Sequence, residues 1–295
     1  MCLQTMIVRA ERIIRVTLFT LLLAIIASST SAARELLVTE GAGAIQRAVD
    51  AAGPGDTIIV EEGEYSENIV IRKPLILRSR KGYQGTVIKA REPSKPAIKV
   101  DSTTDVVISG FTVKGSTVAG IHIYRSSGCK VYGNFATDNY MGIYLDHASD
   151  NLVSSNTAAR NAEGIDLYFS DANKIVNNKA YSNTEKGIVL YSSNENELIE
   201  NEASSNVWDG ITVWNSHRNL VKDNRSVKNT YAIVTNTDDN EFVGNVTMRR
   251  LYFILPVVLV YIALVLYLVE KKIFMMLYPR ASSKRVGPKG RRTRP

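Results

Sequence analysis

The chain has 295 residues, a formal net charge of +7, three histidines and two cysteines. Its charge is unevenly distributed: residues 1–33 carry +2 and residues 249–295 carry +10, which leaves −5 for the body between them. The basic isoelectric point of about 9.3 therefore results from the basic residues at the two ends of the chain. The body is acidic, which argues against a nucleic-acid-binding surface. Because Cys2 lies in the first segment, Cys129 has no intrachain disulfide partner in the body.

Residues 1–33 have the three parts of a secretory signal peptide. Arg9, Arg12 and Arg15 precede an apolar stretch at 16–26, and small residues follow it at 27–33. This apolar stretch is too short to span a bilayer as a helix. We predict cleavage after Ala32 or Ala33, with an uncleaved anchor as the alternative.

Residues 41–52 predict an amphipathic helix. Ile45, Ala48, Val49 and Ala52 share one helical face, and the Gly-Pro-Gly-Asp stretch at 53–56 ends the helix. Strand-like stretches follow at 57–60, 69–71, 75–77 and 86–88. We expect this helix to cover the first strands, whose edges would otherwise be exposed.

The motif Gly-Ile-x-aliphatic then returns at a fixed interval. It stands at Gly120, Gly142, Gly164, Gly187 and Gly210, with a sixth copy at Ala232, so the spacings are 22, 22, 23, 23 and 22 residues. Aliphatic residues lie one and three places after each glycine, which indicates short strands with one buried face. A repeat of this length predicts stacked units, none of which can bury its apolar face alone.

Three columns of asparagine accompany the repeat. Their members are Asn151, Asn173, Asn196, Asn219 and Asn240; Asn134, Asn156, Asn178, Asn201, Asn224 and Asn245; and Asn139, Asn161, Asn183, Asn206 and Asn229. Asparagine tolerates left-handed turns, and stacked copies can bond to one another as ladders. Three strands and three corners in each repeat predict an all-β fold, a parallel β-helix. A leucine-rich repeat has a similar period, but the second half of each copy lacks a helical stripe and a leucine framework.

The opening of the body resembles a known family. The stretch from Ala51 to Leu77, which contains Pro54-Gly55-Asp56-Thr57 and Gly63-x-Tyr65-x-Glu67, resembles the amino-terminal signature of NosD-like proteins, and residues 97–113 resemble the rung that follows it. The resemblance covers roughly residues 38–247. It implies a right-handed parallel β-helix of the class associated with carbohydrate-binding and sugar-hydrolysing domains. The founding members are periplasmic proteins that assist copper-site maturation of nitrous-oxide reductase.

Outward positions of the first strand in each rung form the candidate ligand-binding face. They lie two and four residues after each glycine and include Tyr144, Asp146, Asp166, Tyr168, Tyr191 and Trp214. Aromatic rings stack on the apolar faces of sugars, and carboxylates accept hydrogen bonds from sugar hydroxyls. The alternative is a plain sheet surface stabilised by cross-strand pairs.

The sequence gives weaker signals for catalysis and none for a cofactor. Asp146, Asp166, Tyr144, Tyr168 and His122 could supply a general acid and base. The Asp-Pro-His-Asp motif of alginate epimerases is absent, and so is the Asp cluster expected of a calcium-dependent lyase. The histidines and methionines are not grouped at ligand spacing, so we expect no metal site.

Residues 251–269 are nineteen uncharged, apolar residues, a length that can span a bilayer as a helix. Nine basic residues follow against Glu270 alone, whereas only Arg249 and Arg250 precede the stretch. The positive-inside rule then places the basic tail in the cytoplasm, near anionic lipid, and the body outside. The predicted organisation is a signal at 1–33, an extracytoplasmic β-helix at 34–248, a transmembrane helix at 249–270 and a tail at 271–295.

These features predict a single-pass cell-membrane protein that is not an enzyme. Its β-helix is expected to bind a glycan or a protein partner, such as a cell-surface polysaccharide or protein, through the face defined above. A polysaccharide lyase or a uronate-epimerase-like enzyme is one alternative. A structural component of the cell envelope and an accessory in copper-enzyme maturation are the others.

Overall fold

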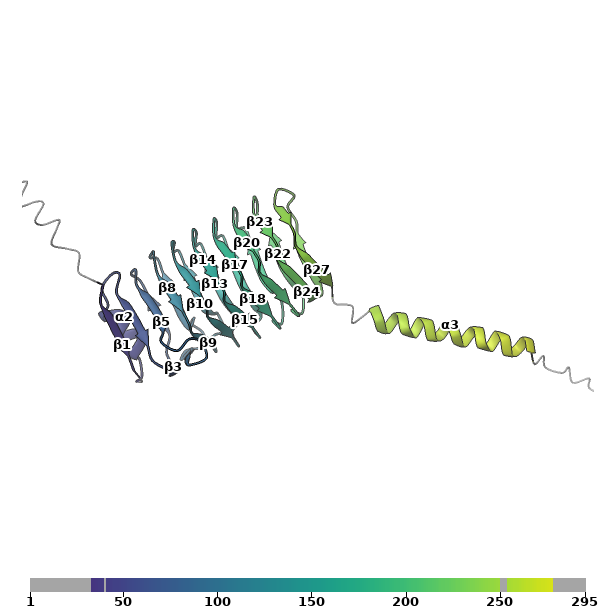
Figure 1. Cartoon of the computed structure of the whole chain (residues 1–295), viewed down its shortest axis with the longest axis horizontal. Coiled ribbons are helices and arrows are strands. Elements are labelled where there is room, and N and C mark those ends of the chain that lie inside the picture. The colour runs from purple at the N-terminus through teal and green to yellow at the C-terminus, as the bar shows by residue number, and fades with distance from the viewer. Residues whose placement is uncertain (1–32, 40, 250–253, 278–295) are drawn as a thin grey trace, which may run out of the picture. The chain divides into compact units, whose positions relative to one another are not determined.

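The computed structural model describes residues 33–39, 41–249 and 254–277 (Figure 1). The chain divides after Arg249 into two compact units. The first unit consists of short strands stacked rung upon rung together with helix α2 (Ala44–Ala51), and the second contains helix α3 (Ile254–Leu277).

The strands of the first unit form three sheets with ten, nine and eight strands, and every neighbouring pair is parallel. The ten-stranded sheet contains β1 (Glu35–Val38), β2 (Thr57–Val60), β5 (Ile76–Ser79), β8 (Val107–Ser109), β11 (Lys130–Tyr132), β14 (Leu152–Ser154), β17 (Lys174–Val176), β20 (Glu197–Ile199), β23 (Leu220–Lys222) and β26 (Glu241–Val243). The nine-stranded sheet contains β3 (Gly63–Ser66), β6 (Thr86–Lys89), β9 (Thr112–Lys114), β12 (Phe135–Thr137), β15 (Thr157–Ala159), β18 (Lys179–Tyr181), β21 (Glu202–Ser204), β24 (Arg225–Asn229) and β27 (Val246–Arg249). The eight-stranded sheet contains β4 (Ile69–Ile71), β7 (Ile98–Asp101), β10 (Ala119–Tyr124), β13 (Met141–Asp146), β16 (Glu163–Tyr168), β19 (Ile188–Tyr191), β22 (Asp209–Trp214) and β25 (Tyr231–Thr235).

The core lies between the three sheets and is built from the aliphatic positions of the repeat. Ile143 and Leu145 on β13 stack on Ile165 and Leu167 on β16, and all four side chains are fully buried. Because the stacking partner is the equivalent residue of the next rung, each rung completes the burial of its neighbour. The predicted all-β parallel β-helix is confirmed.

Asparagine ladders bond each rung to the next at the corners. Asn178 is typical: its Oδ1 accepts the backbone N–H of Asn156 at 2.9 Å, and its Nδ2 donates to the carbonyl oxygen of Val153 at 2.8 Å. The side chain therefore satisfies backbone groups that the strands leave free where they end. Asn224, which begins an Asn-x-Ser sequence, is likewise fully buried, and its Nδ2 donates to the carbonyl oxygen of Leu198.

At the asparagine columns, the left-handed conformation occurs one residue before each asparagine of the middle column rather than on it. Ser155, Asn177 and Glu200 precede members of the middle column and have φ of 55°, 54° and 55°. The asparagine side chains form hydrogen bonds, and the residue before each asparagine adopts the left-handed backbone conformation. The sequence therefore located the corners correctly and assigned the turn geometry to the wrong residue.

Helix α2 packs against β1, β2 and β4, near the amino-terminal end of the stack (Figure 1). Its side chains Ile45 and Val49 are buried. The backbone N–H groups of Ile45 and Gln46 donate to the carboxylate of Glu67 at 3.1 and 3.0 Å, which supplies the cap that Gly43 lacks. The predicted amphipathic helix is confirmed.

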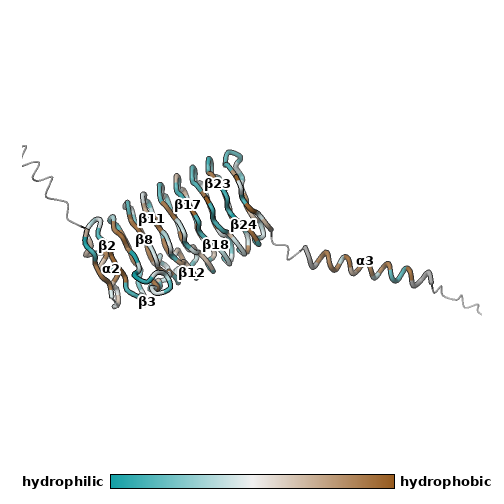
Figure 2. The backbone as a smooth tube through the Cα atoms, viewed as in Figure 1, coloured by the Kyte–Doolittle hydropathy of each residue, from teal (hydrophilic) through white to brown (hydrophobic). Residues whose placement is uncertain are grey.

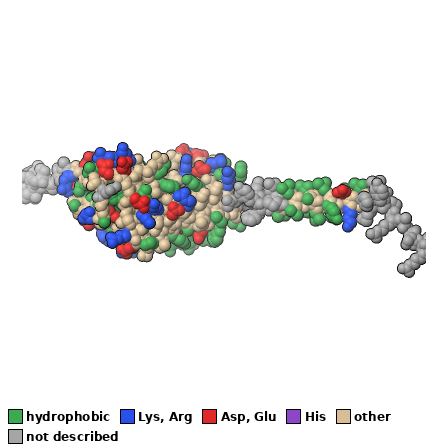
Figure 3. Space-filling view, turned by 90° about the horizontal axis from the view of Figure 1, so that it is seen from below, with side chains coloured by type: hydrophobic (Ala, Val, Ile, Leu, Met, Phe, Trp, Pro, Cys, Tyr) green, Lys and Arg blue, Asp and Glu red, His purple; other side chains and the backbone are tan. Residues whose placement is uncertain are grey.

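The outer surface of the β-helix carries ion pairs between neighbouring rungs. Lys174 and Glu197 lie 3.1 Å apart, and so do Arg72 and Asp101. On the face shown in Figure 3, basic and acidic side chains lie beside one another in the same way. On this face, charges of opposite sign are therefore interspersed.

Helix α3 is coloured as apolar over most of its length in Figure 2. Within the described ranges, no helix meets the length and apolarity that a membrane crossing requires. The predicted transmembrane helix at 249–270 is therefore not confirmed. The predicted signal peptide and the tail after residue 277 lie outside the described residues, so the cytoplasmic orientation of the tail stays a prediction.

Candidate functional site

Two outward columns of side chains cross the eight-stranded sheet. In register, the first column runs Lys99, His122, Tyr144, Asp166, Val189 and Thr212, and the second runs Asp101, Tyr124, Asp146, Tyr168, Tyr191 and Trp214. The alternate residues of the same strands fill the core, so these side chains lie on the outside. The structure thus brings all six candidate residues to one face; their contact with a ligand stays a prediction.

The first part of this face is polar and partly buried. The rings of His122 and Tyr144 stack, with centroids 4.7 Å apart and planes 20° apart. Asp146 Oδ1 lies 2.6 Å from His147 Nδ1, and Asp146 Oδ2 lies 3.6 Å from His122 Nε2, which is too long for a hydrogen bond. Burial lowers the pKa of His122 to about 4, although the Asp146 carboxylate acts in the opposite direction. His122 is therefore neutral at pH 7.

Asp166 occupies the next rung and has an unusual environment. Its Oδ1 is inaccessible to solvent and has no hydrogen-bond partner. Burial, followed by the neighbouring Glu163 carboxylate, raises the pKa of Asp166 well above its usual range, and Lys186 opposes this only in part. Lys186 Nζ lies 3.6 Å from Glu163 Oε1 and forms an ion pair with Glu163. Asp166 consequently keeps its proton at pH values where exposed aspartates have lost theirs.

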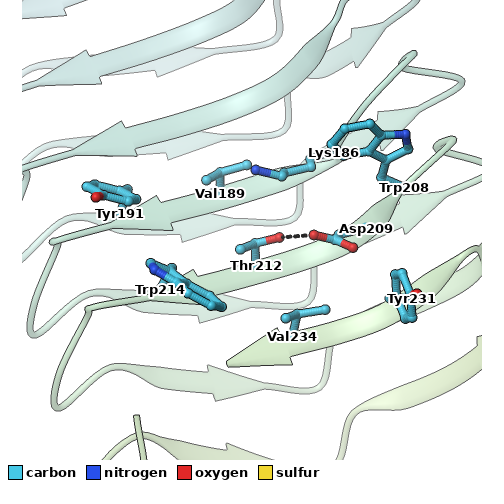
Figure 4. Close-up of a pocket in the computed structure, with 9 residues that line it drawn as sticks. All are labelled: Lys186, Val189, Tyr191, Trp208, Asp209, Thr212, Trp214, Tyr231 and Val234. Carbon is cyan, nitrogen blue, oxygen red and sulfur yellow. Dashed lines mark hydrogen bonds between the residues drawn. The ribbon is translucent and has the colours of Figure 1, made fainter. Parts of the chain in front are cut away.

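The second part of the face is aromatic. Tyr168 and Tyr191 stack with centroids 5.5 Å apart and planes 18° apart. Beyond them lies a cavity of about 520 Å³ (Figure 4), lined by Lys186, Val189, Tyr191, Trp208, Asp209, Thr212, Trp214, Tyr231 and Val234. Trp208 is 55% exposed and Tyr231 is 51% exposed, so both rings are accessible to solvent.

Sequence reasoning found Tyr191 and Trp214 and missed four polar or aromatic residues of this cavity. The missed residues are Lys186, Trp208, Asp209 and Tyr231. Each lies one or two positions before the glycine position of its rung, whereas the predicted face contains only positions after the glycine. The strands β22 and β25 begin at Asp209 and Tyr231, so extending each predicted strand toward the amino terminus would have identified these two residues.

A family model described as "Periplasmic copper-binding protein (NosD)" matches residues 66–249, which is more than half of the chain. The chain belongs to the NosD family. No functionally curated protein matches it in sequence.

Solved structures resemble this NosD member in fold. An alginate lyase from Paenibacillus sp. str. FPU-7 is 14% identical with a TM-score of 0.56, over 74% of this chain and 98% of the lyase. A polygalacturonase from Erwinia carotovora ssp. carotovora is 12% identical with a TM-score of 0.61, over 74% and 80%. A double mutant of the periplasmic alginate epimerase AlgG is 17% identical with a TM-score of 0.54, over 72% and 55%. At such identities the likeness shows a shared β-helix and not a shared activity.

The family description names copper, and the described residues do not fit that ion. Copper is held by grouped His, Cys or Met side chains. Among the described residues, no group of three His, Cys, Asp or Glu side chains could hold a metal ion. Cys129 is buried, and burial raises its pKa, which disfavours the thiolate that binds metals.

Proposed function

We propose that this NosD-family protein is a non-enzymatic glycan-binding protein that holds a saccharide on the outward face of its eight-stranded sheet. The observation that carries the proposal is the cavity lined by Tyr191, Trp208, Trp214 and Tyr231. Aromatic rings that offer a flat apolar face and a polar edge suit sugar rings, which have apolar faces and a rim of hydroxyl groups.

The arrangement of the rings supports an extended ligand. Tyr168, Tyr191 and Trp214 follow one another in a single column, one per rung. Neighbouring parallel strands lie about 4.8 Å apart, so this column offers contacts over roughly 10 Å. Asp209 and Lys186 border the same cavity and can bond to hydroxyl groups. A chain of two or more sugar units that crosses the rungs would contact both the rings and the polar groups.

The site of action that we infer is outside the cytoplasm. The family description is periplasmic, and the predicted signal peptide agrees with export. Attachment to a membrane through residues 249–270 remains a prediction from the sequence. A role in handling copper is not part of the proposal, because the described residues offer no group of ligands for it.

A polysaccharide-modifying enzyme is the second candidate, and one observation favours it. Asp166 keeps a proton through its burial and lies beside Tyr144 in register, so the face carries a potential proton donor. Binding without turnover on any glycan that the protein retains would exclude this candidate. Turnover that is lost in Asp166→Asn while binding is kept would establish it.

The test of the proposal is a glycan-array screen of the purified full chain. We expect a reproducible hit that Tyr168→Ala combined with Trp214→Ala weakens by roughly 30-fold, since two stacking contacts of about 1 kcal/mol each contribute about 2 kcal/mol to binding. Both side chains are exposed in the free protein, so the melting temperature should change little. The matched control removes Tyr132 and Tyr181, which are equally exposed but lie on the other two sheets.

Three results would contradict the proposal. A well-folded protein that binds no glycan would favour a protein partner or a structural role in the cell envelope. Equal loss of binding in the Tyr132/Tyr181 control would mean that the attachment is unspecific. Unchanged binding after loss of Tyr168 and Trp214 would place any glycan site elsewhere.

A further inference from the structure

The cavity of Figure 4 exists because the first outward column changes along the stack. On β10 and β13 this column holds the large rings of His122 and Tyr144, which stack on each other. On β19, β22 and β25 the column continues in register with three short side chains that form the floor of the cavity: Val189, Thr212 and Val234. These short side chains leave open the space that rings occupy on the earlier rungs.

Aromatic rings stand on both sides of this floor. Tyr191 and Trp214 lie on the side where β19 and β22 end (Figure 4). Trp208, which precedes β22, and Tyr231, which begins β25, lie on the opposite side. The cavity is therefore a trough between two aromatic walls, and its volume of about 520 Å³ falls within the roughly 300–1,000 Å³ that is typical of small-molecule pockets. A sugar ring stacked on either wall can direct a substituent toward the floor.

The floor itself is apolar. Val189 and Thr212 are only 4% and 5% exposed, so a ligand can reach little more than their methyl groups. The hydroxyl group of Thr212 donates a hydrogen bond to Asp209 Oδ2 at 2.8 Å, so its proton is already engaged (Figure 4). A sugar hydroxyl placed against this floor would lose hydration without gaining a partner, whereas a methyl group there would be stabilised by burial.

A pair of opposite charges stands at one edge of the floor. Lys186 and Asp209 are the charged residues of the lining, one of each sign, so the lining as a whole favours a neutral ligand. The backbone N–H of Gly187 donates to the carbonyl oxygen of Asp209 at 2.9 Å, which places the two charged residues on neighbouring rungs.

This pair can bond to an amide group. Asp209 uses Oδ2 for Thr212, and its Oδ1 can accept a hydrogen bond from an N–H group. Lys186 Nζ lies 3.6 Å from Glu163 Oε1, which is an ion pair but too long for a hydrogen bond, so its N–H groups can donate to a carbonyl oxygen. One acceptor and one donor beside an apolar floor match an amide that ends in a methyl group.

We propose that the glycan held on this face carries acetamido groups, as N-acetylated hexosamines do. The methyl group of the acetamido substituent contacts Val189 and Val234. Its N–H donates to Asp209, and its carbonyl oxygen accepts from Lys186, while the sugar rings stack on the aromatic walls. This inference rests on the proposed glycan binding and adds the chemical class of the ligand.

The test measures binding of the full chain to three β-1,4-linked tetrasaccharides by calorimetric titration. They are the tetramers of N-acetylglucosamine, glucosamine and glucose. We expect the acetylated tetramer to bind roughly tenfold more tightly than either of the others, because it alone buries a methyl group and forms the amide hydrogen bonds. If no tetramer binds, the same comparison is made between a hit of the glycan array and its counterpart without the acetyl group.

Variants of the floor decide whether the cavity is responsible. Val189→Thr combined with Val234→Thr replaces methyl groups of the floor by hydroxyl groups at nearly constant volume. We expect the ratio of the affinities for the acetylated and glucose tetramers to fall from roughly tenfold to roughly threefold or less. The matched control is Val70→Thr, which changes the same outward column on β4, at the opposite end of the sheet, and should leave the ratio intact. Circular dichroism of each variant establishes that it is folded.

The outcomes separate the two proposals. Equal binding of the three tetramers, tighter binding of the glucosamine or glucose form, or array hits that lack acetamido groups would overturn the inference and leave glycan binding standing. A ratio that is unchanged in the double variant, or that falls equally in Val70→Thr, would also overturn it, since the floor would then not recognise the acetyl group. Binding of none of the three tetramers, together with an empty glycan array, would contradict glycan binding itself.

Discussion

The inward and outward side chains of the β-helix come from the same strands but differ in how far they repeat from rung to rung. Inside, each rung repeats the residue of its neighbour, as Ile143 and Ile165 do in the core and Asn156 and Asn178 do at a corner. Outside, the first outward column runs from Lys99 through histidine, tyrosine, aspartate, valine and threonine without a repeat. Buried positions must match the rung above and below, whereas outward positions are free of that constraint. The variety of the outward columns is therefore where binding specificity can be built.

The largest loss of stability is expected when one member of an asparagine ladder is removed. Asn178→Ala leaves the buried N–H of Asn156 and the carbonyl oxygen of Val153 without their partners. We expect the free energy of unfolding to fall by about 3–5 kcal/mol, because each buried polar group left unpaired costs about 1–3 kcal/mol. Urea unfolding of the full chain, followed by circular dichroism, measures this.

The control for that experiment is Asn236→Ala, which removes an exposed asparagine that bonds to Asn215 at the surface. Its cost should stay below about 1 kcal/mol. Similar losses in the two variants would show that the ladder is not the source of the stability of the corners.

His122 lies on an outward column but is buried. We therefore expect this residue to affect the stability of the fold, as residues of the core do. It is 8% exposed and has a pKa of about 4 when folded, against 6.5 for an ordinary histidine. The folded chain therefore binds fewer protons than the unfolded chain between these pH values, so stability falls as the pH is lowered from 6.5 to 4. The loss through this residue is about 3 kcal/mol when the window has been crossed.

Unfolding free energies measured across this window for the native chain and for His122→Gln test the prediction. The variant should lose most of the dependence on pH. His217→Gln should keep it, since the side chain of His217 is 49% exposed and lies beside Asp239 on the surface. A dependence that survives in His122→Gln would assign it to other groups.

The same contrast explains what could be predicted from the sequence. The inward residues and the asparagines repeat, so their period sufficed to predict the rungs, the corners and the columns on which Tyr168 and Trp214 lie. Trp208 and Tyr231 line the cavity from positions before the repeated motif: Tyr231 is the first residue of β25 and Trp208 directly precedes β22, so the motif predicted neither of them. The raised pKa of Asp166 depends on Glu163, three residues away, and on burial by neighbouring rungs, which no single repeat contains.

The smallest effect is expected on the outside away from the candidate face. Lys174 and Glu197 form an ion pair at 3.1 Å on the ten-stranded sheet, with side chains 59% and 39% exposed. Solvent screens such a pair, so Glu197→Gln should change the free energy of unfolding by no more than about 0.5 kcal/mol and should leave glycan binding unchanged. Urea unfolding and a binding titration of the same sample measure both. A loss above about 1 kcal/mol would mean that ion pairs between rungs are part of what holds the stack together, and the division between a constrained inside and a free outside would then be too simple.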